Sequence, residues 1–229
     1  MDALGPVVFI ILALAVGGVV LYLQWQLAEK RRQAWAAAAA TLGFQFSAQD
    51  PFGLVSLPFV LFRSGDGQGT ENVIWGRWND LDLKVFDAWY YIRRHNTKGG
   101  SRREYHRFTC ALVDLPVSCP HLSVSRETVL SRLADGLGMR DIEFESEEFN
   151  RAFQVQSDDR RFASYMVDAR MMEWLLTTHP YLRFEVHGPR LLCYVRRVAP
   201  DQTGELLETS AGFVAAVPRV VHDVYGEAR

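Results

Sequence analysis

The chain has 229 residues, of which 48% are hydrophobic and 23% are charged, and its formal net charge is −2. Ample apolar content with so little net charge excludes a disordered chain, and the lack of a basic excess argues against nucleic acid as a partner. Three cysteines, an odd number, do not indicate a disulfide framework.

The N-terminus carries a long uncharged run that predicts a membrane-spanning helix. Residues 3–23 contain no charged side chain, and a span needs about 20 apolar residues. Tyr22 and Trp25 lie where the aromatic belt of a membrane interface is expected. A cleaved signal peptide is the alternative, because Ala13 and Ala15 resemble a cleavage site. No basic segment precedes the run, however, and the run continues past Ala15, so a retained anchor is favoured.

Charges beside the span predict its orientation. The basic stretch 30–32 follows it, and Asp2 is the only charge before it. This asymmetry predicts a single-pass protein of the inner (plasma) membrane with its N-terminus outside and its body in the cytoplasm. The lipid bilayer is then its first partner. The small-residue spacing of Ala13 and Gly17 leaves open a homodimer through this helix.

The expected domain organisation has three parts. They are a transmembrane anchor at 1–27, a juxtamembrane helix at 28–43 and a cytoplasmic domain at 44–229, with a possible sub-boundary near 116–140. Residues 27–42 are rich in strong helix formers and continue the anchor helix, and Gly43 ends it.

The first half of the body predicts an antiparallel sheet. The alternating pattern over 72–92 predicts two strands joined by a turn at Asn79 and Asp80. Residues 105–115 form a third expected strand after a long loop at 93–104.

Before these strands, Phe44 and Phe46 alternate with polar residues and predict a short first strand. The stretch 47–71 is loop-like, with a short apolar strand expected at 59–62. Glycines at 65, 67 and 69 do not fit a phosphate-binding loop and predict a flexible hairpin tip.

The second half of the body mixes short helices and strands. The expected elements are a helix over 125–133, a strand over 142–144, a helical turn capped by Ser146, a strand over 153–157, helices over 159–167 and 168–178, a hairpin of strands 182–186 and 191–195, and an amphipathic tail helix over 205–225 that Pro218 kinks or breaks. Helices and strands are interleaved without regular βαβ spacing. The predicted class is α+β: an N-terminal transmembrane helix, then one mixed domain with an antiparallel sheet, short helices and a C-terminal amphipathic helix.

The segment 93–107 concentrates positive charge. Its basic residues are Arg93, Arg94, Lys98, Arg102, Arg103 and Arg107, against the single acid Glu104. Such a segment on a membrane-tethered domain is a candidate contact for anionic lipid, where each charge near the surface contributes about 1 kcal/mol. An acidic protein or RNA is an alternative partner, and a solvated loop without a partner is the bland interpretation. Anionic lipid is favoured over nucleic acid as the partner because the membrane anchor already holds the segment near lipid.

Familiar catalytic and metal motifs are absent from the sequence, so no catalytic residue, metal or cofactor is predicted. Clustered carboxylates leave open an unrecognised hydrolase or transferase. They are Glu143, Glu145, Glu147, Glu148, Asp158 and Asp159. Capping of helix starts explains the same residues more simply. Cys110 and Cys193 stand in apolar strand contexts that are typical of small buried residues.

Several stretches resemble a family of uncharacterised bacterial single-pass membrane-anchored proteins, known only as a domain of unknown function. The stretches are DIEFESEEFNRAFQVQSDDRRFA, MMEWLL, RRQAWAAAAATLGFQF, VIWGRWNDLDLKVFDAWY and FEVHGPRLLCYV. The resemblance implies an anchored α+β domain and supplies no catalytic residue. The leading hypothesis is therefore a membrane-tethered, non-enzymatic binding or adaptor domain with an unknown protein partner.

Overall fold

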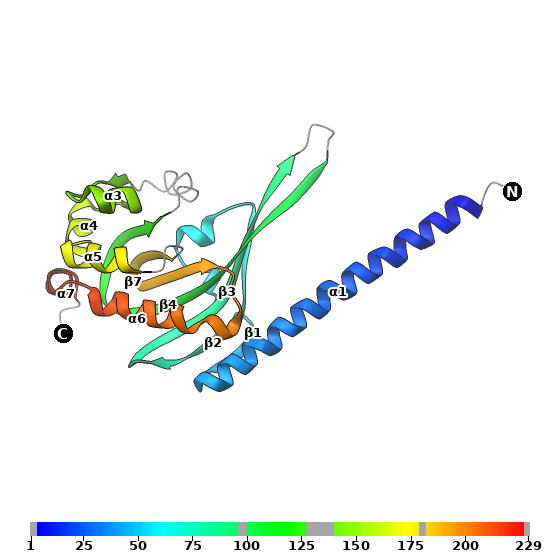
Figure 1. The fold of residues 1–229 in the computed structure, drawn as a ribbon, viewed down its shortest axis with the longest axis horizontal. Helices are drawn as coiled ribbons and strands as arrows, with labels where there is room; N and C mark the ends of the chain where they lie inside the picture. The colour runs from blue at the N-terminus through cyan, green and yellow to red at the C-terminus, as the bar shows by residue number, and fades with distance from the viewer. Residues whose placement is uncertain (1–3, 96–99, 127–139, 179–181, 227–229) are drawn as a thin grey trace.

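The computed structural model describes residues 4–95, 100–126, 140–178 and 182–226 (Figure 1). It begins with α1 (Leu4–Leu42), an unbroken helix whose N-terminal part projects away from the body. Within the described ranges, α1 is the one helix long and apolar enough to cross a membrane, and the rest of the chain covers none of its most apolar stretch. This exposure supports a membrane anchor, because such a surface is unstable in water.

Gly43 ends α1 as expected. Its φ of 69° is left-handed, which a residue without a Cβ adopts at little cost. The amide of Phe44 then donates to the carbonyl of Ala39 over 2.8 Å, which satisfies one of the last free carbonyls of the helix.

The body is built on an antiparallel sheet of seven described strands in the order β1-β2-β3-β4-β6-β5, with β7 also paired to β4. The strands are β1 (Gln45–Gln49), β2 (Gly67–Trp78), β3 (Leu81–His95), β4 (Ser101–Ser125), β5 (Arg140–Ile142), β6 (Gln154–Ser157) and β7 (Arg183–Arg196). The α+β class is confirmed. The long strand β4 organises the sheet, because it pairs with β3, β6 and β7.

The predicted turn between β2 and β3 is confirmed. Trp78 pairs with Leu81, which leaves Asn79 and Asp80 as a two-residue loop. Both loop residues have positive φ, 47° and 63°, the conformation of a type I′ turn. Asn and Asp tolerate this conformation better than most residues with a Cβ, so the turn forms without glycine.

Short helices cover one face of the sheet (Figure 1). They are α3 (Glu147–Ala152), α4 (Arg160–Met166), α5 (Ala169–Thr177), α6 (Gly204–Ala216) and α7 (Arg219–Tyr225). The side chains of Ser146, Asp159 and Asp168 accept hydrogen bonds from the first turns of α3, α4 and α5. The tail helix breaks before Pro218 into α6 and α7, as its sequence predicts.

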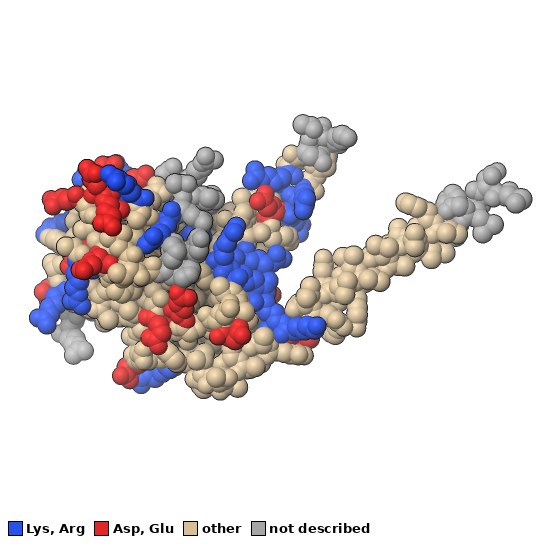
Figure 2. All heavy atoms as spheres, in the orientation of Figure 1, with Lys and Arg blue, Asp and Glu red and all other residues tan. Residues whose placement is uncertain are grey.

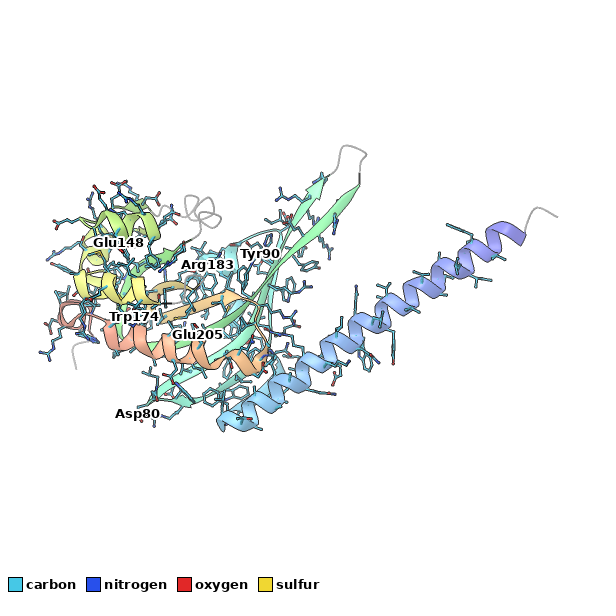
Figure 3. All side chains as sticks on the ribbon, viewed as in Figure 1. Asp80, Tyr90, Glu148, Trp174, Arg183 and Glu205 are labelled. Carbon is cyan, nitrogen blue, oxygen red and sulfur yellow. The ribbon has the colours of Figure 1, made fainter. Side chains whose placement is uncertain are left out.

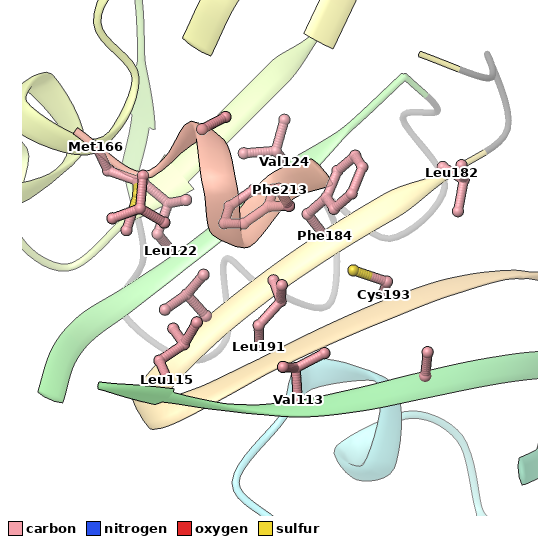
Figure 4. Close-up of a cluster of buried hydrophobic side chains, with 14 of the residues drawn as sticks. Val113, Leu115, Leu122, Val124, Met166, Leu182, Phe184, Leu191, Cys193 and Phe213 are labelled. Carbon is pink, nitrogen blue, oxygen red and sulfur yellow. The ribbon is translucent and has the colours of Figure 1, made fainter. Parts of the chain in front are cut away.

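The main core lies between these helices and the sheet (Figure 4). Phe213 of α6 stacks on Phe184 of β7 with ring centroids 5.1 Å apart, and both side chains are buried. A second core covers the opposite face, where short 3-10 helices, η1 (Leu54–Ser56) and η2 (Val60–Arg63), pack on the sheet. A third 3-10 helix, η4 (Pro200–Gln202), precedes α6.

Two predicted loops or turns are strands. The expected loop at 93–104 is largely the paired ends of β3 and β4, where His95 faces Ser101. The expected hairpin over 182–195 is wrong, because both halves belong to β7 and pair with β4. Gly188, with φ 57°, lies where the pairing of β7 with β4 is irregular, with the extra residues on β4, and the chain continues without a reversal.

Four further expectations need correction. Residues 59–62 are not a strand, because η2 begins at Val60 and Phe59 is the residue before it. The strand expected over 142–144 lies earlier in the chain, since β5 ends at Ile142. The helix expected over 125–133 starts on Ser125, which is the last residue of β4; residues 127–133 lie outside the described ranges. The glycines at 67 and 69 are not a flexible tip but part of β2.

Candidate membrane-facing binding surface

The ends of β3 and β4, residues 89–95 and 101–107, form an arm that extends beyond the rest of the sheet (Figure 1), with β2 paired to its base at 89–91. The arm projects toward the same side as the N-terminal part of α1. Residues 96–99 at its end, including Lys98, lie outside the described ranges. If α1 crosses a membrane, the arm therefore points toward the membrane surface.

Strand alternation gives the arm two different faces. Asp87 contacts α1, so Trp89, Tyr91 and Arg93 share its side of β3. Directly paired residues lie on the same face. The partners on β4 are Arg107, Tyr105 and Arg103, respectively. These six residues are called the arm's inner face.

Guanidinium groups lie over aromatic rings on the inner face. Arg103 lies 4.8 Å from the ring centroid of Tyr91, and Arg107 lies 5.0 Å from that of Tyr105. The two tyrosine rings are 5.5 Å apart, and Trp89 is 5.8 Å from Tyr105. Aromatic rings interleaved with cations suit a membrane interface, where one side of the surface is apolar and the other is anionic.

The glycines of β2 make room for these rings. A Cβ at Gly69 would lie 2.6 Å from the ring of Trp89, and a Cβ at Gly67 would lie 2.6 Å from the ring of Tyr91. Glycine lets each ring cover the neighbouring strand, so these residues support the arm and do not form a phosphate loop.

The structure divides the predicted basic residues between the two faces. Arg93, Arg103 and Arg107 lie on the inner face, whereas Arg94 and Arg102 form a directly paired couple on the opposite face. Arg94 also binds Glu104 at 3.0 Å, which offsets part of the positive charge there. Basic side chains extend from the arm down to α1 in a nearly continuous patch (Figure 2).

The opposite face of the arm is rooted in the second core. Tyr90 stacks on His106 at 4.8 Å and on Phe108 at 5.8 Å. The Arg183 guanidinium lies 5.8 Å from the Phe108 ring centroid and 5.7 Å from that of Tyr194. Tyr90 and Arg183 are labelled at the base of the arm in Figure 3. Burial raises the pKa of Tyr90, so its hydroxyl stays neutral at physiological pH.

A buried carboxylate joins α1 to the sheet. Arg31 donates two hydrogen bonds to Asp87, of 2.7 and 2.6 Å. Trp35 Nε1 and Asn72 Nδ2 each donate to Asp87 Oδ2 over 3.0 Å, and Arg197 lies 3.5 Å from the same oxygen. This group is called the Asp87 joint. It gives the buried charge the multiple donors that it needs, and it fixes α1 against the sheet.

Sequence analysis missed the Asp87 joint, although two signals were present. Leu83, Val85 and Asp87 are every second residue of β3 and therefore share one face of the strand. An acid thus stands in line with two apolar residues. Arg31 and Trp35 are four residues apart and therefore share one face of α1.

A second buried polar cluster lies under η2. Glu185 is fully buried and accepts hydrogen bonds from the amide of Val60 over 2.5 Å and from His121 Nε2 over 2.6 Å. The rings of His121 and His187 meet edge to face with centroids 4.7 Å apart. Desolvation lowers the pKa of His187, and the neighbouring His121 lowers it further. The cluster holds η2 on β7, and its contacts are structural.

The carboxylates proposed for acid–base chemistry have local partners. Asp159 caps α4, Asp158 accepts from the amide of His121, and Glu147 binds Arg151 one helical turn away. Among the described residues, no three His, Cys, Asp or Glu side chains form a group that could hold a metal ion.

The cysteines are buried and free. Desolvation raises the pKa of Cys119 and of Cys193 to about 12, and that of Cys110 well above its ordinary value. A thiol that remains protonated is a poor nucleophile and a poor metal ligand. All three act as small core side chains, as the strand contexts of Cys110 and Cys193 predict.

The fold of this chain resembles that of a protein of known structure. No family model matches the sequence, and no match is found among curated proteins. The fold is similar to the crystal structure of the mycobacterial trehalose monomycolate transport factor A, TtfA, with a TM-score of 0.53. The likeness covers 83% of this chain and 96% of that chain at 16% sequence identity. At this identity the comparison shows a shared fold and nothing about a shared ligand.

Proposed function

We propose that this protein is a single-pass membrane protein whose α+β body is a non-enzymatic binding or adaptor module. The body lies in the cytoplasm and the N-terminus outside, with α1 in the inner membrane. The basic residues that follow the span support this orientation. The structural neighbour is named as a transport factor, which favours an accessory role in a membrane-associated transport process.

The Asp87 joint is the observation that carries this proposal. It couples the helix that enters the membrane to the central strand of the sheet, so the body has one orientation relative to the bilayer. An enzyme acting on soluble substrates needs only a flexible tether. A module that presents one surface to a membrane-embedded partner benefits from a fixed attachment.

Affinity purification tests the adaptor role. Tagged full-length protein is purified from its native membranes and compared with residues 1–35, which retain the anchor but lack the sheet. We expect proteins that co-purify with the full chain and are lost with the anchor alone. Identical sets of co-purifying proteins in the two samples would contradict a binding role for the body.

Protease accessibility tests the orientation separately. In intact cells we expect the body to resist an external protease, and in opened cells we expect it to be digested. Digestion in intact cells would overturn the cytoplasmic placement.

A second candidate function is contact with anionic lipid through the arm. The inner face favours this function. There Arg93, Tyr91 and Trp89 and their β4 partners combine cations with aromatic residues of the kind found at membrane interfaces. The arm would then hold the body against the membrane surface.

The two faces of the arm supply a matched control. A fragment of residues 28–229 keeps Arg31 and Trp35, and its fold is checked by circular dichroism before vesicle binding is measured. Charge reversal of the inner pair Arg93 and Arg103 should weaken binding to phosphatidylglycerol vesicles and reduce its salt dependence. The same reversal of Arg94 and Arg102, on the opposite face, should weaken it less. Equal effects of the two pairs would rule out a specific inner face.

A further inference from the structure

We propose that the cleft between α1 and the sheet binds the phosphate headgroup of an anionic membrane phospholipid. The inference rests on the proposed insertion of α1 in a membrane. The cleft has a volume of about 630 Å³. Its charged and amide lining comes from four segments: Arg31 and Arg32 of α1, Glu71 and Asn72 of β2, Arg107 of β4, and Arg197, which follows β7.

The cleft holds more positive than negative charge. Arg31 and Arg197 share the carboxylate of Asp87. Arg107 forms no ion pair with any described residue, and the one described ion pair of Arg32 is the exposed contact with Glu29 at 3.5 Å, one helical turn away. These two guanidinium groups keep donors available for an added anion. Arginine binds phosphate well because its planar group donates two parallel hydrogen bonds.

Two buried polar atoms of lining residues have no hydrogen-bond partner in the described part of the chain. One is Arg197 Nε, a donor, and the other is Asn72 Oδ1, an acceptor. A phosphate oxygen would accept a hydrogen bond from Arg197 Nε. The negative charge of the phosphate would offset the cost of burying this guanidinium group. A hydroxyl or ammonium group on the headgroup would donate to Asn72 Oδ1. The cleft therefore fits a phosphodiester that carries a hydrogen-bond donor, as phospholipid headgroups do.

The position of the cleft favours a lipid over a free phosphate ion. Gln24 and Leu27 of α1 also line it. They follow the end of the apolar run at Leu23 and flank Trp25, whose ring stacks on Tyr22 at 6.1 Å. With the run in the bilayer, these residues lie at the depth of the lipid headgroups. The acyl chains of a bound lipid would then follow the exposed apolar side chains of α1 into the membrane.

Binding of short-chain phosphatidylglycerol to the full-length protein in neutral detergent tests the proposal. We expect saturable binding that Arg107→Gln and Arg32→Gln each weaken about tenfold or more, the usual effect of losing a charged hydrogen bond. Neither residue bonds to Asp87, so both variants should keep the wild-type melting temperature. Arg77→Gln, at the exposed β2–β3 turn, is the matched control and should bind as wild type. Wild-type affinity in both cleft variants, or no saturable binding, would overturn the proposal.

Two further measurements separate this site from its alternatives. Inorganic phosphate at millimolar concentration should fail to displace the lipid; full displacement would identify a free-anion site and overturn the lipid assignment. Arg103→Gln should have a smaller effect than Arg107→Gln. A loss confined to Arg103→Gln would move the binding to the arm and contradict the cleft. In these cases the topology and partner experiments still decide the proposed function by themselves.

Discussion

Arg31 and Asp87 form a bidentate ion pair although 56 residues separate them in the sequence. The carboxylate side chain is 3% exposed and the arginine side chain is 15% exposed. Trp35 and Asn72 donate to the same carboxylate, and Arg197 lies 3.5 Å from it. With Arg31, four described side chains therefore surround one acid. The polar part of the attachment of the anchor helix therefore centres on one side chain of β3, beside the apolar packing of Trp35 and Ala39 in the main core.

Asp87→Ala should destabilise the protein strongly. Removing the carboxylate leaves the Arg31 guanidinium partly buried without its counter-ion, and such a loss costs about 3–5 kcal/mol. The free energy of unfolding of the full-length protein in detergent, from urea titration, measures the effect. Asp82→Ala on the same strand is the control, since the Asp82 side chain is 76% exposed, and its effect should stay within about 0.5 kcal/mol. Similar effects of the two substitutions would show that the joint contributes little.

Gly76→Ala should also destabilise the fold, through packing. A Cβ at Gly76 would overlap the ring of Phe44, which is buried where the chain leaves α1 and enters the sheet. Overpacking of this kind costs about 1–3 kcal/mol. Gly204→Ala is the matched substitution, because a Cβ there meets no atom within 4 Å. We expect thermal unfolding of Gly204→Ala at or slightly above the wild-type temperature, and a decrease as large as that of Gly76→Ala would refute the packing argument.

The cysteines should be inert in the folded protein. Burial raises the pKa of Cys119 and of Cys193 to about 12, so the thiolate form is scarce at pH near 8. Mass spectrometry after iodoacetamide treatment should show no modification of the native chain and three modifications after unfolding. Ser164→Cys, at an exposed position of α4, should react at once and shows that the reagent is active. Modification of a native cysteine in the folded chain would show an accessible thiol.

Acid should destabilise the protein in part through His187. Its pKa in the fold lies below the ordinary value of 6.5, mainly because of desolvation. The unfolded chain therefore binds a proton more readily, and stability decreases as the pH falls below the ordinary value toward the folded pKa. The melting temperature of wild type should fall over this range, and His187→Gln should reduce the slope. His222→Gln on the exposed side of α7 is the control. Equal slopes for wild type and His187→Gln would remove His187 as a cause.

Local signals predicted the elements that depend on a few neighbouring residues. Asn79 and Asp80 adopt the turn expected of them, Pro218 divides the tail helix, and Ser146 caps α3. Each feature follows from the conformational limits or hydrogen bonds of one or two residues. Tertiary contacts only reinforce these choices.

Features set by distant pairing were missed or wrong. Gly188 and Pro189 form a common turn pair, but both halves of β7 find partners on β4, so the chain continues. Only the outer part of the arm, within 93–104, was predicted as a loop, because its polar side chains give no strand pattern although Arg93 pairs with Arg103. An isolated acid such as Asp87 is usually exposed in a strand, and only the approach of α1 makes its burial favourable.

The unbroken course of α1 fixes the azimuth of the body around the helix axis. Because each residue of a helix turns the chain by about 100° and advances it by about 1.5 Å, inserting one residue between Trp25 and Arg31 would swing the arm toward a different neighbour in the membrane. Inserting seven residues, about two turns, would nearly restore the heading while lifting the body about 10 Å from the bilayer. The number of residues added to one helix thus sets both the direction in which the body faces and its height above the bilayer.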